Sequence, residues 1–251
     1  SSTGHMILLE EFVHLNFSAE FWNVFLVVIQ LGAILAVVLI YFKKIWPFNF
    51  HKEKGPLIKM DIMQLWFKIL VACIPAAIVG ILFDEILEKY LYNAVVVALM
   101  LIIFGVGFIY IENHSKGKAR VSSLNEISYK DAVIIGIFQL IAAIFPGTSR
   151  SGATILGALI GVSRKVAAEF TFFLAIPVMF GASLLKMLKV SYFFSLAEWA
   201  VLLVGMVSAF IVSIIAIRFL MSYIKKHDFK VFGYYRIVIG IIVLLYFFIL
   251  K

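Results

Sequence analysis

The apolar positions of this 251-residue chain gather into long runs that short polar segments separate. A helix needs about 20 mostly apolar residues to cross the hydrocarbon core of a bilayer. Six runs meet that length and predict six transmembrane helices, at residues 21–42, 65–83, 93–112, 166–187, 197–220 and 232–250. Two further apolar segments, 1–16 and 131–161, do not fit as simple spans. The break at residues 146–152 divides the second segment and predicts two short helices there.

The composition favours the same class of protein. Hydrophobic residues make up 64% of the chain and charged residues only 14%, against roughly 25% charged residues in soluble domains. The runs are too long for barrel strands, so we predict an all-α integral membrane protein. A net charge of +8 can indicate nucleic-acid binding, but in a membrane protein it is typical of basic cytoplasmic loops. We therefore expect the lipid bilayer, and no nucleic acid, as a partner.

Lysine and arginine residues between the runs orient the spans, because cytoplasmic loops carry an excess of them. Fifteen of these residues can share one side of the membrane: Lys43, Lys44, Lys52, Lys54, Lys59, Lys116, Lys118, Arg120, Lys130, Arg164, Lys165, Arg218, Lys225, Lys226 and Lys230. The opposite side then holds Lys89, Lys186, Lys189 and Lys251. This assignment requires residues 131–161 to enter from the cytoplasm and return to it. We predict a re-entrant helical hairpin with Arg150 at its tip, near mid-depth.

An internal repeat relates the two halves of the chain when the sequence is shifted by about 148–149 residues. The pair Glu20-Phe21 then matches Glu169-Phe170, and eleven residues later a Gly-Ala pair matches a second Gly-Ala pair. The charge count places the two halves in opposite orientations, as in inverted-topology repeats whose broken helices meet near the midplane. We predict a single transmembrane domain over 1–251, with inverted repeats at about 1–112 and 131–251.

The repeat also predicts a second re-entrant hairpin, because residues 1–5 align with the tip at 149–153. The first arm of that hairpin would precede Ser1. We expect the given chain to lack an N-terminal helix of about twenty residues, which leaves the first hairpin incomplete.

The two tips carry residues suited to phosphate chemistry. A charged side chain at membrane depth is costly and usually marks a site, and Arg150 has the planar fork that matches phosphate oxygens. Near it lie three hydroxyl groups and two glycines that allow a backbone to approach an anion. The other tip offers hydroxyl groups and the imidazole of His5, which can attack phosphorus or move a proton. Simpler interpretations remain: serine and threonine often only cap helices, and His5 can be a satisfied polar residue.

These motifs carry a family resemblance. The stretch 146–154 (PGTSRSGAT), together with Ser-Ser-Thr-Gly-His at 1–5, resembles the undecaprenyl-diphosphate phosphatase family, the bacitracin-resistance type of bacterial membrane phosphatase. The likeness covers essentially the whole chain. It implies hydrolysis of a C55 polyprenyl diphosphate lipid to the monophosphate plus phosphate, which recycles the carrier for cell-wall synthesis. The site would open toward the outer face of the bacterial plasma membrane.

The resemblance also implies residue roles. Ser2 is a candidate nucleophile, His5 a candidate nucleophile or acid–base partner, and Arg150 a ligand of the diphosphate; which of Ser2 and His5 attacks stays open. The residues expected to help bind substrate are Ser1, Thr3, Gly4, Gly147, Thr148, Ser149, Ser151, Gly152 and Thr154. A divalent cation, Mg²⁺ or Ca²⁺, is expected as cofactor. Family members carry paired acidic residues just before the first tip, so we expect the metal ligands upstream of Ser1 and the chain as given to be inactive or part of a longer polypeptide.

A second function is open on the same residues. Inverted repeats with broken helices are common in transporters, so the chain could be a lipid-phosphate transporter or flippase that binds a phosphate head group without cleaving it. The presence of both Ser2 and His5 favours the phosphatase, since transport has less use for reactive groups. A homodimer is a further open alternative.

Overall fold

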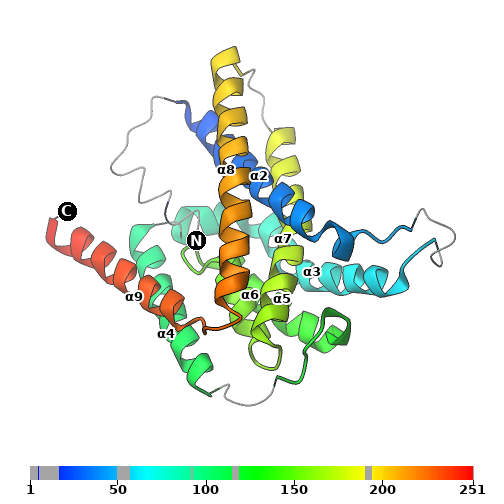
Figure 1. Cartoon of the computed structure of the whole chain (residues 1–251). Helices are drawn as coiled ribbons and strands as arrows, with labels where there is room; N and C mark the ends of the chain where they lie inside the picture. Colours follow the sequence, from blue (N-terminus) through cyan, green and yellow to red (C-terminus); the bar gives the residue numbers. More distant parts are fainter. Residues whose placement is uncertain are drawn as a thin grey trace. The chain divides into compact units, whose positions relative to one another are not determined.

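The computed structural model describes residues 5, 17–49, 57–91, 93–114, 119–189 and 194–250. In these residues the fold is helical throughout, apart from two isolated β-bridges (Figure 1). The helices are α2 (Ala19–Ile45), α3 (Met60–Leu91), α4 (Ala94–His114), α5 (Tyr129–Ile144), α6 (Arg150–Ala158), α7 (Arg164–Lys189), α8 (Leu196–Tyr223) and α9 (Lys230–Leu245). A short 3₁₀ turn, η2 (Leu124–Glu126), precedes α5, and a π-helical turn, η3 (Tyr246–Leu250), follows α9.

The six predicted spans are confirmed. Six helices are long and apolar enough to cross a membrane, and each coincides with one predicted run to within a few residues. Many of their large apolar side chains are exposed, which suits helices that face lipid. The end of α3 differs from the prediction, because its helix continues through Asp84 and Glu85 to Leu91. Glutamate and lysine are good helix formers, so the polar residues end the apolar run without ending the helix.

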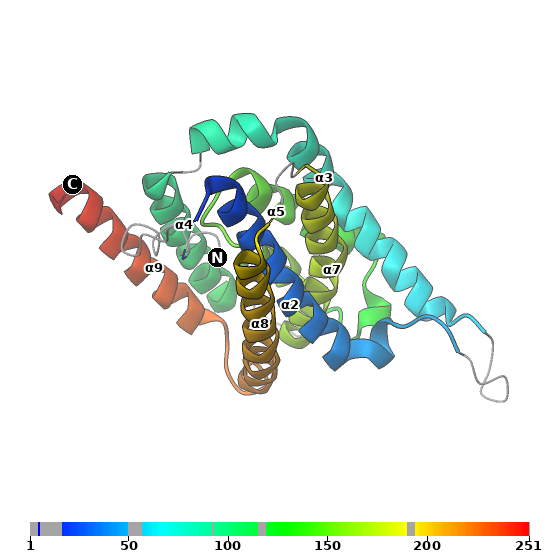
Figure 2. The same ribbon diagram turned by 90° about the horizontal axis from the view of Figure 1, so that it is seen from above.

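The described residues form two compact units. The first contains His5 and residues 68–171 and 223–250, and the second contains residues 17–67 and 172–222. In the second unit, α2 and α8 cross at Gly32, where a Cβ would lie 3.0 Å from the carbonyl carbon of Met206 (Figure 2). Ser183 on α7 donates a hydrogen bond to the Val27 carbonyl oxygen, at 3.3 Å. Small and polar residues thus join these three helices at close range, as is usual in membranes.

In the first unit, α4 and α9 lie side by side (Figures 1 and 2). Gly105 and Gly233 face each other across this interface. A Cβ on either glycine would lie 2.8 Å from the carbonyl oxygen of the other. The two backbones can therefore approach only because both positions lack a side chain. This close packing fixes α9 against α4, and both helices contact the segment that joins α5 to α6.

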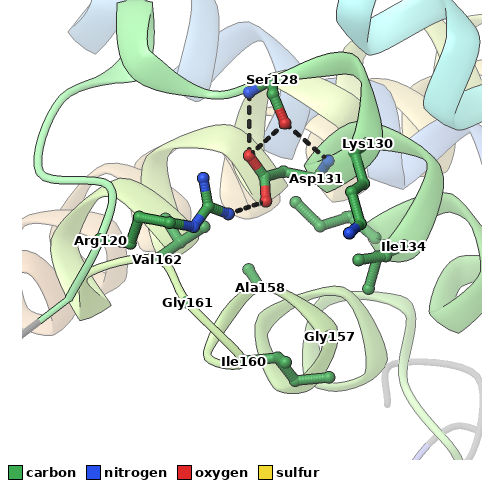
Figure 3. Close-up of a pocket in the computed structure, with 11 residues that line it drawn as sticks. Arg120, Ser128, Lys130, Asp131, Ile134, Gly157, Ala158, Ile160, Gly161 and Val162 are labelled. Carbon is green, nitrogen blue, oxygen red and sulfur yellow. Dashed lines mark hydrogen bonds and ion pairs between the residues drawn. The ribbon is translucent and has the colours of Figure 1, made fainter. Parts of the chain in front are cut away.

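Helices α5 and α6 form a hairpin whose two ends are joined by backbone hydrogen bonds. Val121 lies just before the hairpin; its N–H donates to the Gly161 carbonyl oxygen at 3.1 Å, and its own carbonyl oxygen accepts from Ser163 N–H at 2.9 Å. Ser128 caps α5, and the Asp131 carboxylate accepts hydrogen bonds from its N–H at 2.9 Å and its hydroxyl at 2.6 Å (Figure 3). The chain therefore enters and leaves the hairpin at the same place.

Arg120 closes the base of the hairpin by an ion pair with Asp131 (Figure 3). Burial opposes ionisation of that carboxyl group, but the hydrogen bonds from Ser128 and the guanidinium of Arg120 hold the pKa of Asp131 below its usual value. A pocket of about 410 Å³, lined in part by Lys130 and Gly161, opens at this base. The base is thus polar, while the tip at the other end of α5 lies among α4 and α9.

Candidate active site

The tip of the hairpin is a short, irregular turn between two helices. The helix α5 ends at Ile144, and Phe145 N–H still donates to the Ile141 carbonyl oxygen at 2.9 Å. Pro146 cannot continue the helix, because it has no N–H to donate. Ser149 has a φ of 64°, and among the described residues it is the one non-glycine residue with positive φ. Such strain persists only where the surrounding structure imposes it, and it is concentrated at functional sites.

Ser149 is the N-cap of α6. Its hydroxyl oxygen accepts a hydrogen bond from Gly152 N–H at 3.3 Å, and its carbonyl oxygen accepts from Ala153 N–H at 2.9 Å. The simpler interpretation of this serine as a helix cap is therefore correct, and a role in binding substrate stays a prediction. Arg150 and Ser151 follow the cap at the start of α6, where the helix dipole favours an anion.

Gly147 is packed against the backbone of α4. Its φ is +86°, and a Cβ there would lie 2.7 Å from the Cα of Val97 and closer still to the Val97 carbonyl oxygen. Pro146 and Thr148 on either side are buried, and Thr148 is completely inaccessible to solvent. Packing against α4 gives this glycine a structural reason that the sequence did not reveal. Its predicted closeness to an anion is not tested by this contact.

Arg236 on α9 holds the other face of the tip. Its Nη2 donates to the carbonyl oxygen of Gly147 at 2.8 Å and, at closer range, to that of Thr148. The side chain is buried, with 7% exposure, and its guanidinium lies 6.0 Å from the centre of the Phe108 ring. Its Nη1 occupies the space that a side chain at Gly152 would need. A side chain at this position would thus require the guanidinium of Arg236 to shift.

Arg236 is the main residue that the sequence interpretation missed. It lies inside the apolar run 232–250, and a guanidinium inside such a run was the signal that singled out Arg150. The same signal was therefore available for Arg236. Its partners could not be read from the sequence, since Gly147 and Thr148 lie 89 and 88 residues away.

The other predicted residues of this tip divide into two groups. Arg150 is half-buried and Ser151 is exposed, so both side chains can be reached from outside the protein. Thr154, in contrast, is 1% exposed, and its hydroxyl donates to the Arg150 carbonyl oxygen at 2.9 Å. A hydroxyl that bonds back into its own helix is a common structural arrangement. The accessible part of the tip is therefore its first helical turn, at Ser149, Arg150 and Ser151.

Of the first predicted tip, the structure describes only His5; Ser1, Ser2, Thr3 and Gly4 lie outside the described residues. The Nε2 of His5 and the Oη of Tyr235 form a hydrogen bond of 2.8 Å, and their rings stack with centroids 6.0 Å apart. Tyr235 precedes Arg236 on α9. Consecutive residues of one helix thus contact a residue of each predicted tip.

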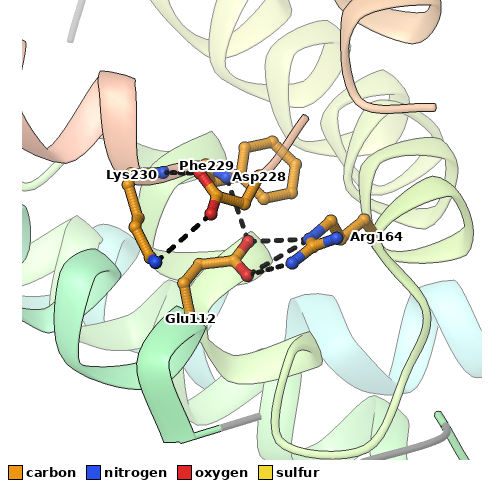
Figure 4. A network of polar contacts seen from close by, with 5 residues as sticks. All are labelled: Glu112, Arg164, Asp228, Phe229 and Lys230. Carbon is orange, nitrogen blue, oxygen red and sulfur yellow. Dashed lines mark hydrogen bonds and ion pairs between the residues drawn. The ribbon is translucent and has the colours of Figure 1, made fainter. Parts of the chain in front are cut away.

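An ion pair between the buried Glu112 carboxylate and the more exposed Arg164 fixes the start of α9. The Glu112 carboxylate at the end of α4 accepts hydrogen bonds from Arg164 Nε at 3.0 Å and Nη2 at 2.5 Å (Figure 4). The same carboxylate accepts from Phe229 N–H at 3.0 Å. Asp228 and Lys230 form a second, weaker pair at 3.4 Å. This network ties the ends of three helices together and so sets where the next turns of α9 lie.

The described residues do not offer a metal site. No group of three or more His, Cys, Asp or Glu side chains within them is placed to hold an ion. Around the tip they supply two guanidinium groups, hydroxyls and N–H groups, which suit an anion and do not fit a divalent cation. The expectation of metal ligands upstream of Ser1 stays a prediction.

The helices and the tip define an all-helical, multi-pass membrane protein with a broken, arginine-bearing hairpin. The chain belongs to the bacitracin resistance protein BacA family, whose sequence pattern matches residues 1–242.

Three relatives are named for an enzymatic activity. The chain is 64% identical to the undecaprenyl-diphosphatase of Desulfitobacterium hafniense over 98% of this chain and 89% of that protein. It is 62% identical to undecaprenyl-diphosphatase 1 of Clostridium acetobutylicum, over 98% and 90% of the two chains. It is 60% identical to an undecaprenyl-diphosphatase of Enterococcus faecalis, over 98% and 89%.

Proposed function

We propose that this protein hydrolyses undecaprenyl diphosphate to undecaprenyl phosphate and inorganic phosphate in the bacterial plasma membrane, and so recycles the lipid carrier for cell-wall synthesis. Relatives at 60–64% identity are named for this activity. The observation that carries the proposal to residues is the half-buried Arg150 at the first turn of α6, where the dipole of the helix favours an anion.

In this proposal, Arg150 and the first N–H groups of α6 bind the diphosphate and stabilise the charge that develops on its terminal phosphoryl group. Ser149 and Ser151 add hydroxyl groups on the accessible side, and Ser1, Thr3 and Gly4 complete the site. Ser2 or His5 attacks the terminal phosphorus, the bridging P–O bond breaks, and undecaprenyl phosphate leaves. Water then releases phosphate. The hydrogen bond to Tyr235 orients the imidazole of His5 for either role.

The membrane topology belongs to the same proposal. The α5–α6 segment is re-entrant: α5 and α6 have 16 and 9 residues, or about 24 and 13 Å at 1.5 Å per residue, less than the roughly 30 Å of the hydrocarbon core. Backbone bonds between its ends support entry and exit on one side. Each compact unit draws segments from both 1–112 and 131–251, which supports inverted repeats. The charge count has this hairpin enter from the cytoplasm, and the resemblance implies a site that opens toward the outer face.

The divalent cation expected from the resemblance, Mg²⁺ or Ca²⁺, is proposed to bind outside the described residues. A lipid-phosphate transporter remains the second candidate, because an anion-binding tip in an inverted repeat also suits translocation.

Phosphate release from undecaprenyl diphosphate by the full-length protein in detergent micelles tests the function. Loss of one electrostatic donor typically costs about a hundredfold or more in turnover, so Arg150→Ala should reduce the rate to that extent. Arg218→Ala, at an exposed position on α8, is the matched control and should retain normal turnover. In proteoliposomes, movement of the lipid between leaflets without phosphate release would favour the transporter. Normal turnover by Arg150→Ala in micelles would refute the site.

A further inference from the structure

We infer that Arg236 is a positioning residue for the reaction: it holds the tip by two carbonyl oxygens and thereby directs Arg150 and the N–H groups of α6 at the diphosphate. This inference rests on the proposed function, and it adds a residue that the family motif at 146–154 does not contain.

The burial of Arg236 favours a positioning role over direct contact with the lipid. Arg236 is 7% exposed, and its guanidinium is enclosed by the tip carbonyls, Gly152 and the Phe108 ring. A substrate that reached its Nη atoms would have to displace the tip itself. Arg150 and Ser151 are the accessible residues of the tip, so a contact with substrate falls to them.

The hydrogen bonds set the direction of the tip. A trans peptide is planar, with its N–H opposite its C=O. Because the Thr148 carbonyl oxygen points to Arg236, the N–H of Ser149 points away from α9. The N–H of Thr148 is occupied by a turn to the Phe145 carbonyl oxygen, at 3.4 Å. One guanidinium thus turns the Ser149 donor in the opposite direction and sets the start of α6, where Arg150 is the first residue.

Gly152 fits this interpretation. A Cβ there would clash with Nη1 of Arg236 and would lie 3.5 Å from its Cζ. The guanidinium of Arg236 therefore fills the space that a side chain at Gly152 would take. The two residues are expected to act together. A side chain at 152 would shift Nη1, and because the guanidinium is rigid this also disturbs Nη2, which holds the two carbonyl groups.

The Arg236 charge also supports anion binding. Within the described part of the chain its hydrogen bonds go to carbonyl oxygens and not to a carboxylate, and its Nε has no hydrogen-bond partner there. Its positive charge is therefore not neutralised by an ion pair in those residues, and it adds to that of Arg150 at the tip. Because these carbonyl partners are neutral, the guanidinium of Arg236 can hold the tip and still contribute its positive charge there.

A double-mutant cycle between Arg236→Lys and Gly152→Ala tests the inference in the full-length protein. A lysine has no second branch, so it gives up the fork and also vacates the space beside Gly152. A misplacement of about 1 Å in a site can cost about a hundredfold, and we expect each single variant to lose at least about tenfold in kcat. The KM for the lipid should change less than about threefold, since the polyprenyl chain does not contact the buried guanidinium.

The double variant should be no more than about threefold slower than Arg236→Lys alone, because residues that act through one contact are not additive. Independent losses that multiply to about a hundredfold would overturn the pairing, as would normal turnover by Arg236→Lys. Arg236→Gln, which keeps a donor but not the fork, replaces the lysine variant if that variant does not fold. Arg218→Lys on α8 is the control for the chemical change and should retain wild-type kinetics.

A binding measurement separates this inference from the phosphatase proposal. Inorganic pyrophosphate, which can bind the tip through its phosphoryl groups alone, should raise the thermal midpoint of the wild-type protein, and Arg236→Lys should reduce that shift while its own midpoint in buffer stays within a few degrees. If the wild type releases no phosphate but shows this pattern, the function fails and the positioning role stands. An equal pyrophosphate shift in both proteins refutes the positioning role whatever the activity.

Discussion

Gly147→Ala is the sharpest test of how the tip is held. The backbone at this position has a φ of +86°, and a methyl group would lie 2.7 Å from the Cα of Val97. Left-handed backbone costs about 1–2 kcal/mol in an L-residue, and overpacking a close contact costs about 1–3 kcal/mol. Together these costs are about 2–5 kcal/mol, and the variant can relieve the strain if the tip moves away from α4.

The expected result is a protein that folds but turns over slowly. Since each 1.4 kcal/mol corresponds to a tenfold change, about 2–5 kcal/mol spent on moving the tip predicts a loss of at least about thirtyfold in phosphate release per folded molecule. The thermal midpoint should fall as well. Purified variant and wild type are compared in the same micelles, with folded protein quantified by size-exclusion chromatography before the rate is measured.

Two glycine variants control for the substitution itself. Gly80→Ala on α3 places a methyl group where no atom lies within 4 Å, and alanine is the better helix former, so stability should hold or rise. Gly32→Ala pushes against the Met206 backbone in the other unit and should lower the thermal midpoint while leaving the rate per folded molecule near normal. Wild-type turnover and stability in Gly147→Ala would refute the contact with Val97.

Three further results are expected. Glu112→Gln should cost about 1–3 kcal/mol of stability, because a buried carboxylate that accepts from three donor groups is lost. Glu198→Gln, which removes a carboxylate that accepts from Ser195 N–H at the start of α8, should cost at most about 1 kcal/mol; the reverse order of thermal midpoints would contradict the network. EDTA should abolish phosphate release and Mg²⁺ or Ca²⁺ should restore it, whereas full activity in chelator excludes the cation. Single cysteines at Lys52 and Glu85, in a background without the native cysteine, should label from opposite sides of intact cells or inverted vesicles, and labelling of both from outside would refute the predicted orientation of the spans.

The sequence was sufficient for the spans because hydropathy is a local property. Each span requires about twenty apolar residues in a row, and six such runs became six helices. Polarity proved a poor guide to where helices end, since α3 passes Asp84 and Glu85 without interruption. The boundary of a run marks where water begins, and glutamate-rich helix is stable in water.

The break between α5 and α6 was also predictable, since Pro146 and the glycines interrupt a helix wherever they occur. The contacts that hold the break in place could not be predicted. A side chain at Gly147 would meet the backbone of Val97, and one at Gly152 would meet the guanidinium of Arg236. Both contacts join segments distant in the sequence, so the sequence supported only the local explanation, in which glycine approaches an anion.

The bond between α9 and the tip sets an order of events during synthesis. The carbonyl oxygens of Gly147 and Thr148 leave the ribosome 88 or 89 residues before the guanidinium that binds them. Until α9 is inserted, these polar atoms have no access to that partner in a region where bare backbone is costly. In the proposed re-entrant topology, the hairpin therefore stays partly hydrated while α7 and α8 are made. The active conformation of the tip is completed only when α9 enters the membrane, so the protein cannot turn over substrate before that helix has been inserted.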